Sequence, residues 1–159
     1  MSTVVALSTP QGRGALAVIR LSGPRAIPIA QQLARVDSFA PRYATLTDLI
    51  AFDEVLDQVL LTCFPAPHSL TGEDVVEISC HGSPAIVRRV IDATLELGAV
   101  LAGPGEFTLR ALSNGKINLA QAEAIRDLIA AQTDAAIKQA ARQLNGELSK
   151  ALDPYKEKL

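Results

Sequence analysis

The seven residues from Ala15 to Leu21 constrain the fold more than any other part of the chain, because six of them are apolar and only Arg20 is charged. A half-exposed strand alternates apolar and polar residues, so a run this continuous is typical of a strand at the centre of a sheet. The composition is that of a globular fold, since 48% of the 159 residues are hydrophobic and 20% are charged. The sequence therefore predicts a folded domain built on a sheet.

Other segments predict the elements around this central strand. The short step Phe52–Glu54 separates two strand-like runs, which favours a hairpin. Ser22-Gly23-Pro24 predicts a helix start, and Pro28 lies close enough to that start to be tolerated. Gly98 is suited to follow the end of a helix. The expected strands are 3–7, 15–21, 43–50, 55–64, 74–79 and 99–102, and the expected helices are one from 22–24 onward, one at 84–97 and a short one at 108–112.

The composition changes after Asn118. Ala, Gln, Glu, Arg and Leu dominate from there, with no strand signal through Leu144. Asn118 and Gln121 have the spacing of a capping box, which predicts that a helix begins at this point. The sequence thus changes from a mixed strand and helix pattern to a helical one.

Helical spacing of apolar residues continues past Gly146, where Pro154 favours a kink or a new helix. We expect an α+β fold with a mixed sheet in residues 1–117, followed by the first part of a helical domain in 118–159. The apolar stripe of that helical part finds no partner helices in the sequence, so we expect the chain to be a piece of a longer protein.

Charge and cysteine content exclude several classes of protein. The formal net charge is −2 and Lys and Arg are not clustered, so the chain does not resemble a module that grips nucleic acid by itself. No stretch is long and apolar enough to span a membrane, and no signal pattern opens the chain, which favours a cytoplasmic protein. Cys63 and Cys80 have no CxxC spacing and are expected to be reduced and buried. Cys80 and His81 are neighbours in an expected extended segment, so they point to opposite faces and do not form a catalytic pair.

Two glycine motifs resemble nucleotide-binding loops without meeting their requirements. Gly12–Ala17 matches G-x-G-x-x-A, but strand residues follow where a dinucleotide site needs a helix. The alternative for this segment is a flexible turn whose amides approach a ligand. Asn114-Gly115-Lys116 lacks the first glycine of a P-loop, since position 110 is Arg110, and Ile117 stands where Ser or Thr is required.

Three charged residues are candidates for a binding site. Glu77 lies inside an expected strand on a partly covered face, where a carboxylate needs a partner. That partner is either Arg20, alone among apolar residues of the central strand, or a ligand with two adjacent N–H donors. Lys116 precedes a helix, where it reaches an anionic ligand or is simply solvated. Glu73 and Asp74, by contrast, are expected to be solvated after a Thr71-Gly72 bend.

Five segments together resemble the N-terminus of the tRNA modification GTPase MnmE (TrmE) family, in the order of that family and as far as about Leu144. They are Thr9–Ala15 continuing through Ile19–Gly23, Ser69–Glu77, Cys80–Gly82, Pro104–Thr108 and Asn114–Ala124.

The resemblance implies a fold similar to that of tetrahydrofolate-binding proteins, homodimerisation, and binding of a 5-formyltetrahydrofolate-type one-carbon carrier. The family's folate contacts fall on Arg20, Glu77 and Lys116, and the Gly12–Gly14 loop can line the same pocket. No catalytic residue or metal ligand is implied within this chain. This chain departs from the family pattern at two places. Ser83 stands where a second glycine is common, and Leu112-Ser113 precedes Asn114 where an aromatic residue and a leucine are more usual.

For the parent protein, the resemblance implies a Ras-like GTPase domain outside this chain. With a flavin-dependent partner, MnmG or GidA, such a protein modifies carbon 5 of the wobble uridine of tRNA, using GTP hydrolysis that depends on potassium and magnesium. This chain alone is not expected to be catalytic. The alternative is a dimerisation and scaffold module without a ligand, in which Arg20 and Glu77 form an internal ion pair.

Overall fold

The computed structural model describes residues 1–146, which form two compact units that divide between Phe107 and Thr108. The predicted boundary at residue 117 stays a prediction. The first unit contains strands β1 (Val4–Leu7), β2 (Leu16–Ser22), β3 (Thr45–Ala51), β4 (Glu54–Phe64), β5 (Val75–His81) and β6 (Val100–Leu101), with helices α1 (Ala26–Ala34) and α2 (Pro84–Glu96). Helix α3 (Glu106–Ser113) spans the division, and α4 (Leu119–Ala130) and α5 (Asp134–Leu144) follow it.

The six strands form one sheet in the order β3-β4-β5-β2-β1-β6. The β1–β6 pair is parallel and the other neighbours are antiparallel, so the predicted α+β class with a mixed sheet is confirmed. β2 lies between β1 and β5 and is the predicted central strand. Its residues Ile19 and Leu21 are fully buried.

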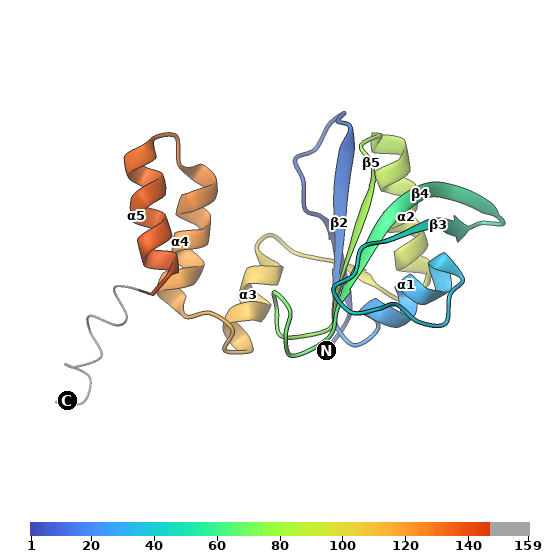
Figure 1. The fold of residues 1–159 in the computed structure, drawn as a ribbon, viewed down its shortest axis with the longest axis horizontal. Helices are drawn as coiled ribbons and strands as arrows, with labels where there is room; N and C mark the ends of the chain where they lie inside the picture. Colours follow the sequence, from blue (N-terminus) through green and yellow to red (C-terminus); the bar gives the residue numbers. More distant parts are fainter. Residues whose placement is uncertain (147–159) are drawn as a thin grey trace. The chain divides into compact units, whose positions relative to one another are not determined.

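Helices α1 and α2 pack against one face of the sheet (Figure 1). We call this the inner face, and the face formed by the alternate side chains the outer face. Because successive residues of a strand point to opposite faces, Ile19 and Ile78 lie in the core while Arg20 and Glu77 lie on the outer face. The outer face is therefore where polar side chains of the central strands become available to a ligand.

The first helix begins later than its sequence predicts. Ser22 is the last residue of β2 rather than a helix start, because its buried hydroxyl bonds with Thr71. Gly23 then turns the chain with a φ of 132°, and a Cβ there would lie 2.7 Å from the Cα of Thr3. Helix α1 follows at Ala26, and Pro28 falls in its first turn, where a missing N–H is tolerated as expected.

The predicted hairpin between β3 and β4 is confirmed. Phe52 and Asp53 occupy its turn with φ values of 53° and 59°. Two central residues with positive φ match the right-handed twist of the strands they join. The turn therefore keeps β3 and β4 in one twisted ribbon.

In the second unit, α4 and α5 lie side by side (Figure 1). The predicted capping box is present, since the Asn118 side chain accepts from the Gln121 amide and the Gln121 side chain accepts from the Asn118 amide. The break between the two helices was not predicted. Thr133 causes it locally, because its hydroxyl accepts from the Ala136 amide and caps α5. The helical pattern predicted after Gly146 lies outside the described residues.

Within residues 1–146, no helix is long and apolar enough to cross a membrane.

Candidate ligand site on the outer face

The central feature of the outer face is an ion pair between β2 and β5. Arg20 and Glu77 are directly opposite in the antiparallel register. Glu77 Oε1 accepts from Arg20 Nε at 3.0 Å and from Nη2 at 2.7 Å. The two side chains are 24% and 33% exposed, so the pair is partly desolvated yet still open to a ligand. The structure thus brings together two of the three predicted site residues.

Phe107 completes the surroundings of this pair. The Arg20 guanidinium carbon lies 5.6 Å from the centre of the Phe107 ring, which is within the range of a cation–π contact. A carboxylate and an aromatic ring therefore both restrict the guanidinium. The contact of Phe107 with Arg20 was not predicted, because a contact between residues so far apart in the chain depends on the fold.

The two oxygens of Glu77 differ in their bonding. Both bonds from Arg20 go to Oε1, and no group of residues 1–146 donates to Oε2. A carboxylate can accept several hydrogen bonds through its two oxygens. The carboxylate can therefore accept an additional pair of adjacent N–H donors without losing Arg20.

A buried chain of hydroxyls anchors the loop that precedes β5. Ser22 Oγ and Thr71 Oγ1 are 2.7 Å apart, and Ser22 Oγ donates to Glu73 Oε2 at 2.7 Å. The prediction that Glu73 is a solvated turn residue is therefore wrong, because its carboxylate is an acceptor for the end of β2. Asp74 is also an acceptor, from the Ala66 amide at 2.8 Å. The loop is thus tied to the strand that carries Arg20.

The glycine loop before β2 is fixed by backbone contacts. Gly14 donates to the Gly82 carbonyl at 3.0 Å, and Gly82 donates to the Ala15 carbonyl at 3.2 Å. β2 begins directly afterwards at Leu16, so the expected absence of a helix after these glycines is confirmed. Ser83, the departure from the family pattern, has a φ of −84°, so this position does not require glycine.

His81 and Asp57 form a second polar pair that the sequence analysis did not identify. Asp57 Oδ1 lies 2.8 Å from His81 Nδ1, and Asp57 Oδ2 accepts from the His81 amide at 2.8 Å. The Asp57 side chain is 8% exposed and that of His81 is 67% exposed. Asp57 meets the same criterion as Glu77, because a carboxylate inside an apolar strand needs a partner.

Both cysteines are buried in the inner-face core, as predicted. Burial is the main cause that raises the pKa of each thiol from the usual 9.0 to about 11, and the charge of Asp74 adds to it for Cys63 and that of Asp57 for Cys80. Cys80 and His81 point to opposite faces, so the prediction that they do not form a catalytic pair is confirmed.

We expect the folded chain to react with Ellman's reagent at near-neutral pH about a hundredfold more slowly than the unfolded chain, because the thiolate is the reactive form. The raised pKa of each thiol also makes the free energy of unfolding depend on pH, because the thiols of the unfolded chain ionise first. The contribution of the two buried thiols to stability is fully present below pH 9.0 and is lost as the pH rises toward about 11. Absorbance after addition of the reagent, with and without urea, measures the two rates. Rapid labelling of the folded chain would contradict this expectation.

Lys116, the third predicted site residue, belongs to the second unit. It is exposed, and its amide donates to the Ala111 carbonyl at 2.8 Å as the chain leaves α3. Gly115 precedes it with a φ of 67°. The loop position predicted for Lys116 is confirmed, and its role toward a ligand stays a prediction.

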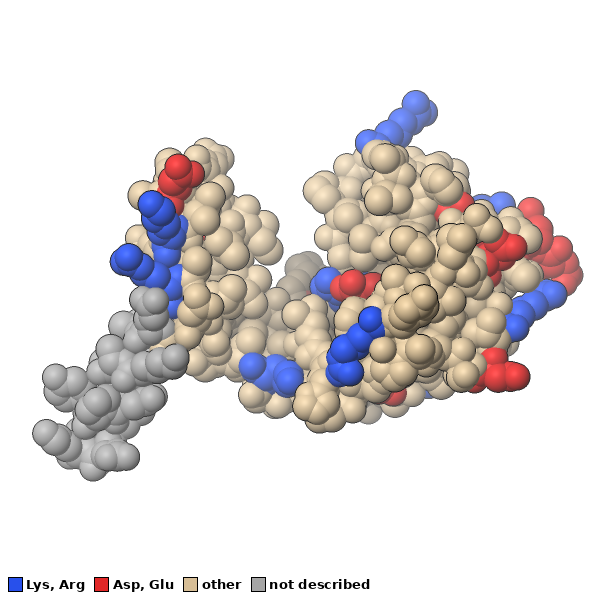
Figure 2. All heavy atoms as spheres, viewed as in Figure 1, with Lys and Arg blue, Asp and Glu red and all other residues tan. Residues whose placement is uncertain are grey.

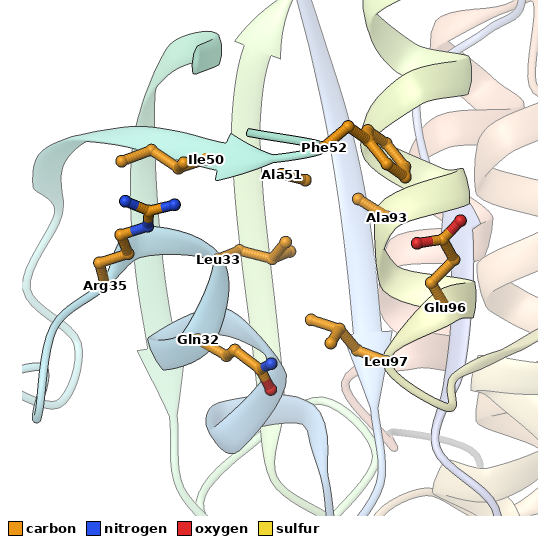
Figure 3. A pocket seen from close by; sticks show the side chains of 9 residues that line it. All are labelled: Gln32, Leu33, Arg35, Ile50, Ala51, Phe52, Ala93, Glu96 and Leu97. Carbon is orange, nitrogen blue, oxygen red and sulfur yellow. The ribbon is translucent and has the colours of Figure 1, made fainter. Parts of the chain in front are cut away.

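Two cavities of the first unit lie on the inner side of the sheet. One of about 260 Å³ lies where α1 and α2 end beside the β3–β4 turn, with Arg35 and Glu96 on opposite sides of an apolar floor that includes Leu33 (Figure 3). The other, of about 400 Å³, is lined by Leu7, Gln11, Gly12, Pro84, Val87, Arg88 and Ile91. Neither is lined by Arg20 or Glu77, so these cavities are separate from the outer-face pair.

Acidic and basic side chains are interspersed over the visible face of the sheet unit, without a continuous field of one sign (Figure 2). Phosphate backbones are bound by clustered cations. On this face, the charge distribution agrees with the prediction from the sequence.

Comparisons with known proteins agree with the resemblance. The family described as "GTP-binding protein TrmE N-terminus" matches residues 3–116. A protein of Wolinella succinogenes named tRNA modification GTPase MnmE is 52% identical over 95% of this chain, and proteins of the same name from Francisella philomiragia and Koribacter versatilis are each 46% identical over 99% of it. The chain spans about a third of the length of these relatives. The family match and this level of identity show that the chain belongs to the TrmE N-terminus family.

Proposed function

We propose that this chain is the ligand-binding and pairing part of a GTPase that modifies carbon 5 of the wobble uridine of tRNA. Its own task in that protein is to bind a 5-formyltetrahydrofolate-type carrier and to pair with a second copy. The names of the relatives support the parent activity. The arrangement of Arg20 and Glu77 supports the ligand.

The single observation that carries the ligand proposal is the available oxygen of Glu77. A pterin presents a ring N–H beside an exocyclic amine, and a carboxylate accepts from both. Glu77 Oε2 has no donor among the described residues, and Oε1 retains its bonds to Arg20. The site therefore supplies the acceptors that this edge requires, in a partly desolvated position.

The surface beside the pair suits the rest of such a molecule. The next row of the outer face holds Leu60, Ser79 and Val18, which are register partners across β4, β5 and β2. Leu60 is 46% exposed, so an aromatic ring has apolar surface to cover. The bound carrier would supply a one-carbon unit, while the chain's residues orient it.

The remaining ligands and partners of the parent protein are expected to bind outside residues 1–146. We propose that GTP, potassium and magnesium bind in the GTPase domain of the longer protein, and that a flavin-dependent partner and tRNA join the full complex in the cytoplasm. Within residues 1–146, no group of three or more His, Cys, Asp or Glu side chains is placed to hold a metal ion. Lys116 remains a proposed contact for the carrier.

Titration calorimetry of the chain with 5-formyltetrahydrofolate tests the ligand proposal. We expect saturable binding of one carrier per chain, because each chain has one Arg20–Glu77 pair. p-Aminobenzoylglutamate, which lacks the pterin, should bind far more weakly. No heat of binding from a folded, dimeric sample would remove the ligand half of the proposal.

The rival is a scaffold module in which Arg20 and Glu77 are only an internal ion pair. The observed ion pair is compatible with it, since a partly exposed pair can be purely structural. Sedimentation would then give a dimer that is indifferent to folate. A monomer at high concentration would instead contradict the pairing that both hypotheses include.

A further inference from the structure

We propose that His81, held by Asp57, is a further contact for the carrier and binds the carboxylates of its glutamate tail. This inference rests on the proposed function, because it takes the pterin to lie at Glu77. It adds a direction to that function: the ligand would run along β5 from Glu77 toward His81.

The imidazole of His81 is held in a defined orientation. Asp57 bonds both its ring Nδ1 and its backbone amide, and the Gln58 amide donates to Asp57 Oδ1 at 2.9 Å. A buried carboxylate behind an imidazole fixes which ring nitrogen faces outward. Nδ1 is committed to Asp57, so Nε2 is the nitrogen left for a ligand. In its protonated form the ring donates from Nδ1 to Asp57 and from Nε2 to a carboxylate.

The position of His81 relative to Glu77 follows from the strand. The two residues are four positions apart on β5, so their Cα–Cβ bonds point to the same, outer face, and the His81 ring turns from there toward Asp57 on β4. At about 3.3 Å per residue the separation along the strand is about 13 Å. A pterin and an aminobenzoyl ring laid end to end cover a distance of this order, and the glutamate begins where they end.

Three successive rows of the outer face match the three parts of the ligand. The first holds the Arg20–Glu77 pair, which accepts an N–H edge. The second holds Ser79 with Leu60 and Val18 on either side of it, and these two apolar side chains can contact a ring. The third pairs His81 with Leu16, which is 67% exposed, and so ends the row sequence with a group that can donate to an anion.

If the Asp57–His81 contact served only the fold, the bond of Asp57 to the His81 amide would be sufficient. The Asp57 carboxylate already satisfies the His81 amide at the end of the β4–β5 ladder, and this bond does not require an imidazole. The ring itself is mostly in solvent. The identity of the side chain at position 81 therefore has its largest expected effect on a bound molecule rather than on stability.

The test compares two ligands on the full 159-residue chain: 5-formyltetrahydrofolate and the corresponding pteroate, which lacks the glutamate. Measured at about pH 6, so that an imidazole can carry the second proton that Nε2 would donate, the wild type should bind the glutamate-bearing ligand about fivefold more tightly, the effect of one partly solvated charge-assisted hydrogen bond. His81→Ala should lose this preference and keep its affinity for the pteroate. His68→Ala is the matched control, because His68 is also exposed and its hydrogen bonds are made by its backbone, the amide to the Pro65 carbonyl and the carbonyl to Arg42.

Each outcome decides between the inference and the function on which it rests. A His81→Ala protein that retains the wild-type preference for the glutamate would overturn the contact while leaving folate binding intact, and so would equal affinity of the wild type for both ligands. If the wild type binds neither ligand, the proposed function and the contact both fail. Thermal unfolding of His81→Ala close to that of the wild type would show that any lost preference is not a loss of folding.

Discussion

Replacing Glu77 with alanine should weaken binding of 5-formyltetrahydrofolate by at least about a hundredfold while leaving the chain folded. The carboxylate is the proposed acceptor for the pterin edge, and it also holds Arg20 in place through two bonds. Its removal takes away the charge-assisted hydrogen bonds of the ligand and frees the guanidinium to move. Calorimetry with the wild type and the variant measures the change in dissociation constant.

The effect on stability should be much smaller than the effect on binding. Both side chains of the pair are partly exposed, so water can replace the lost carboxylate, and the cost in unfolding free energy is expected to be about 1 kcal/mol. Arg20 also retains its contact with Phe107. Urea denaturation should therefore show a cooperative transition for Glu77→Ala.

Glu54→Ala is the matched control for the binding measurement. Glu54 forms a similar ion pair, with Arg89, and lies at the start of β4 away from the outer-face pair. Its loss should leave the affinity within about twofold, because surface pairs of this kind contribute little. If both glutamate variants bound the carrier as tightly as the wild type, Glu77 would not be the pterin acceptor.

Replacing Gly82 with alanine should lower the free energy of unfolding by about 3 kcal/mol. A Cβ at this position would lie 2.4 Å from the carbonyl oxygen of Gly14 and 2.7 Å from its carbonyl carbon. These are backbone atoms, so no flexible side chain can give way. The loop before β2 and the residues that follow β5 would have to separate, which weakens the hydrogen bonds that join Gly82 to Gly14 and Ala15.

Gly103→Ala and Ser83→Ala are the controls for Gly82→Ala. They show how much an alanine substitution changes the free energy of unfolding where no close backbone contact is involved. A Cβ at Gly103 would have its nearest neighbour at 3.7 Å, an ordinary contact. The Ser83 side chain makes no cap bond to α2. Both should change the free energy of unfolding by no more than about 0.5 kcal/mol. A Gly82→Ala protein as stable as these controls would show that the glycine loop can move away without cost.

Local sequence was sufficient for the elements whose determinants are close together. The continuous apolar run identified β2 as central, and the spacing of Asn118 and Gln121 identified the start of α4. Alternation along a strand placed Arg20 on the face opposite Ile19, and this is how the pair with Glu77 was anticipated. These inferences required only the periodicity of a strand or the geometry of one helical turn.

Contacts that depend on register between distant strands were beyond the sequence. Asp57 and His81 meet because β4 and β5 are neighbours, and Phe107 meets Arg20 because the chain returns to the sheet after β6. Ser22 was predicted to begin a helix because its partner Thr71 could not be seen from local sequence. In each case a side chain is fixed by a residue more than 20 positions away, and local patterns carry no information about that partner.

The ring of Phe107 and the carboxylate of Glu77 together leave the Arg20 guanidinium little freedom before any ligand arrives. Immobilising side chains opposes association, because it lowers their conformational entropy. In this chain the Arg20 side chain is already ordered by folding, so ligand binding does not have to order it. Lysine at position 20 would keep the charge, but it has neither the flat surface for the ring nor the forked donors for one oxygen. A ligand would then have to order Glu77 as it binds, so affinity would fall although the charge at position 20 and the Glu77 carboxylate are both still present.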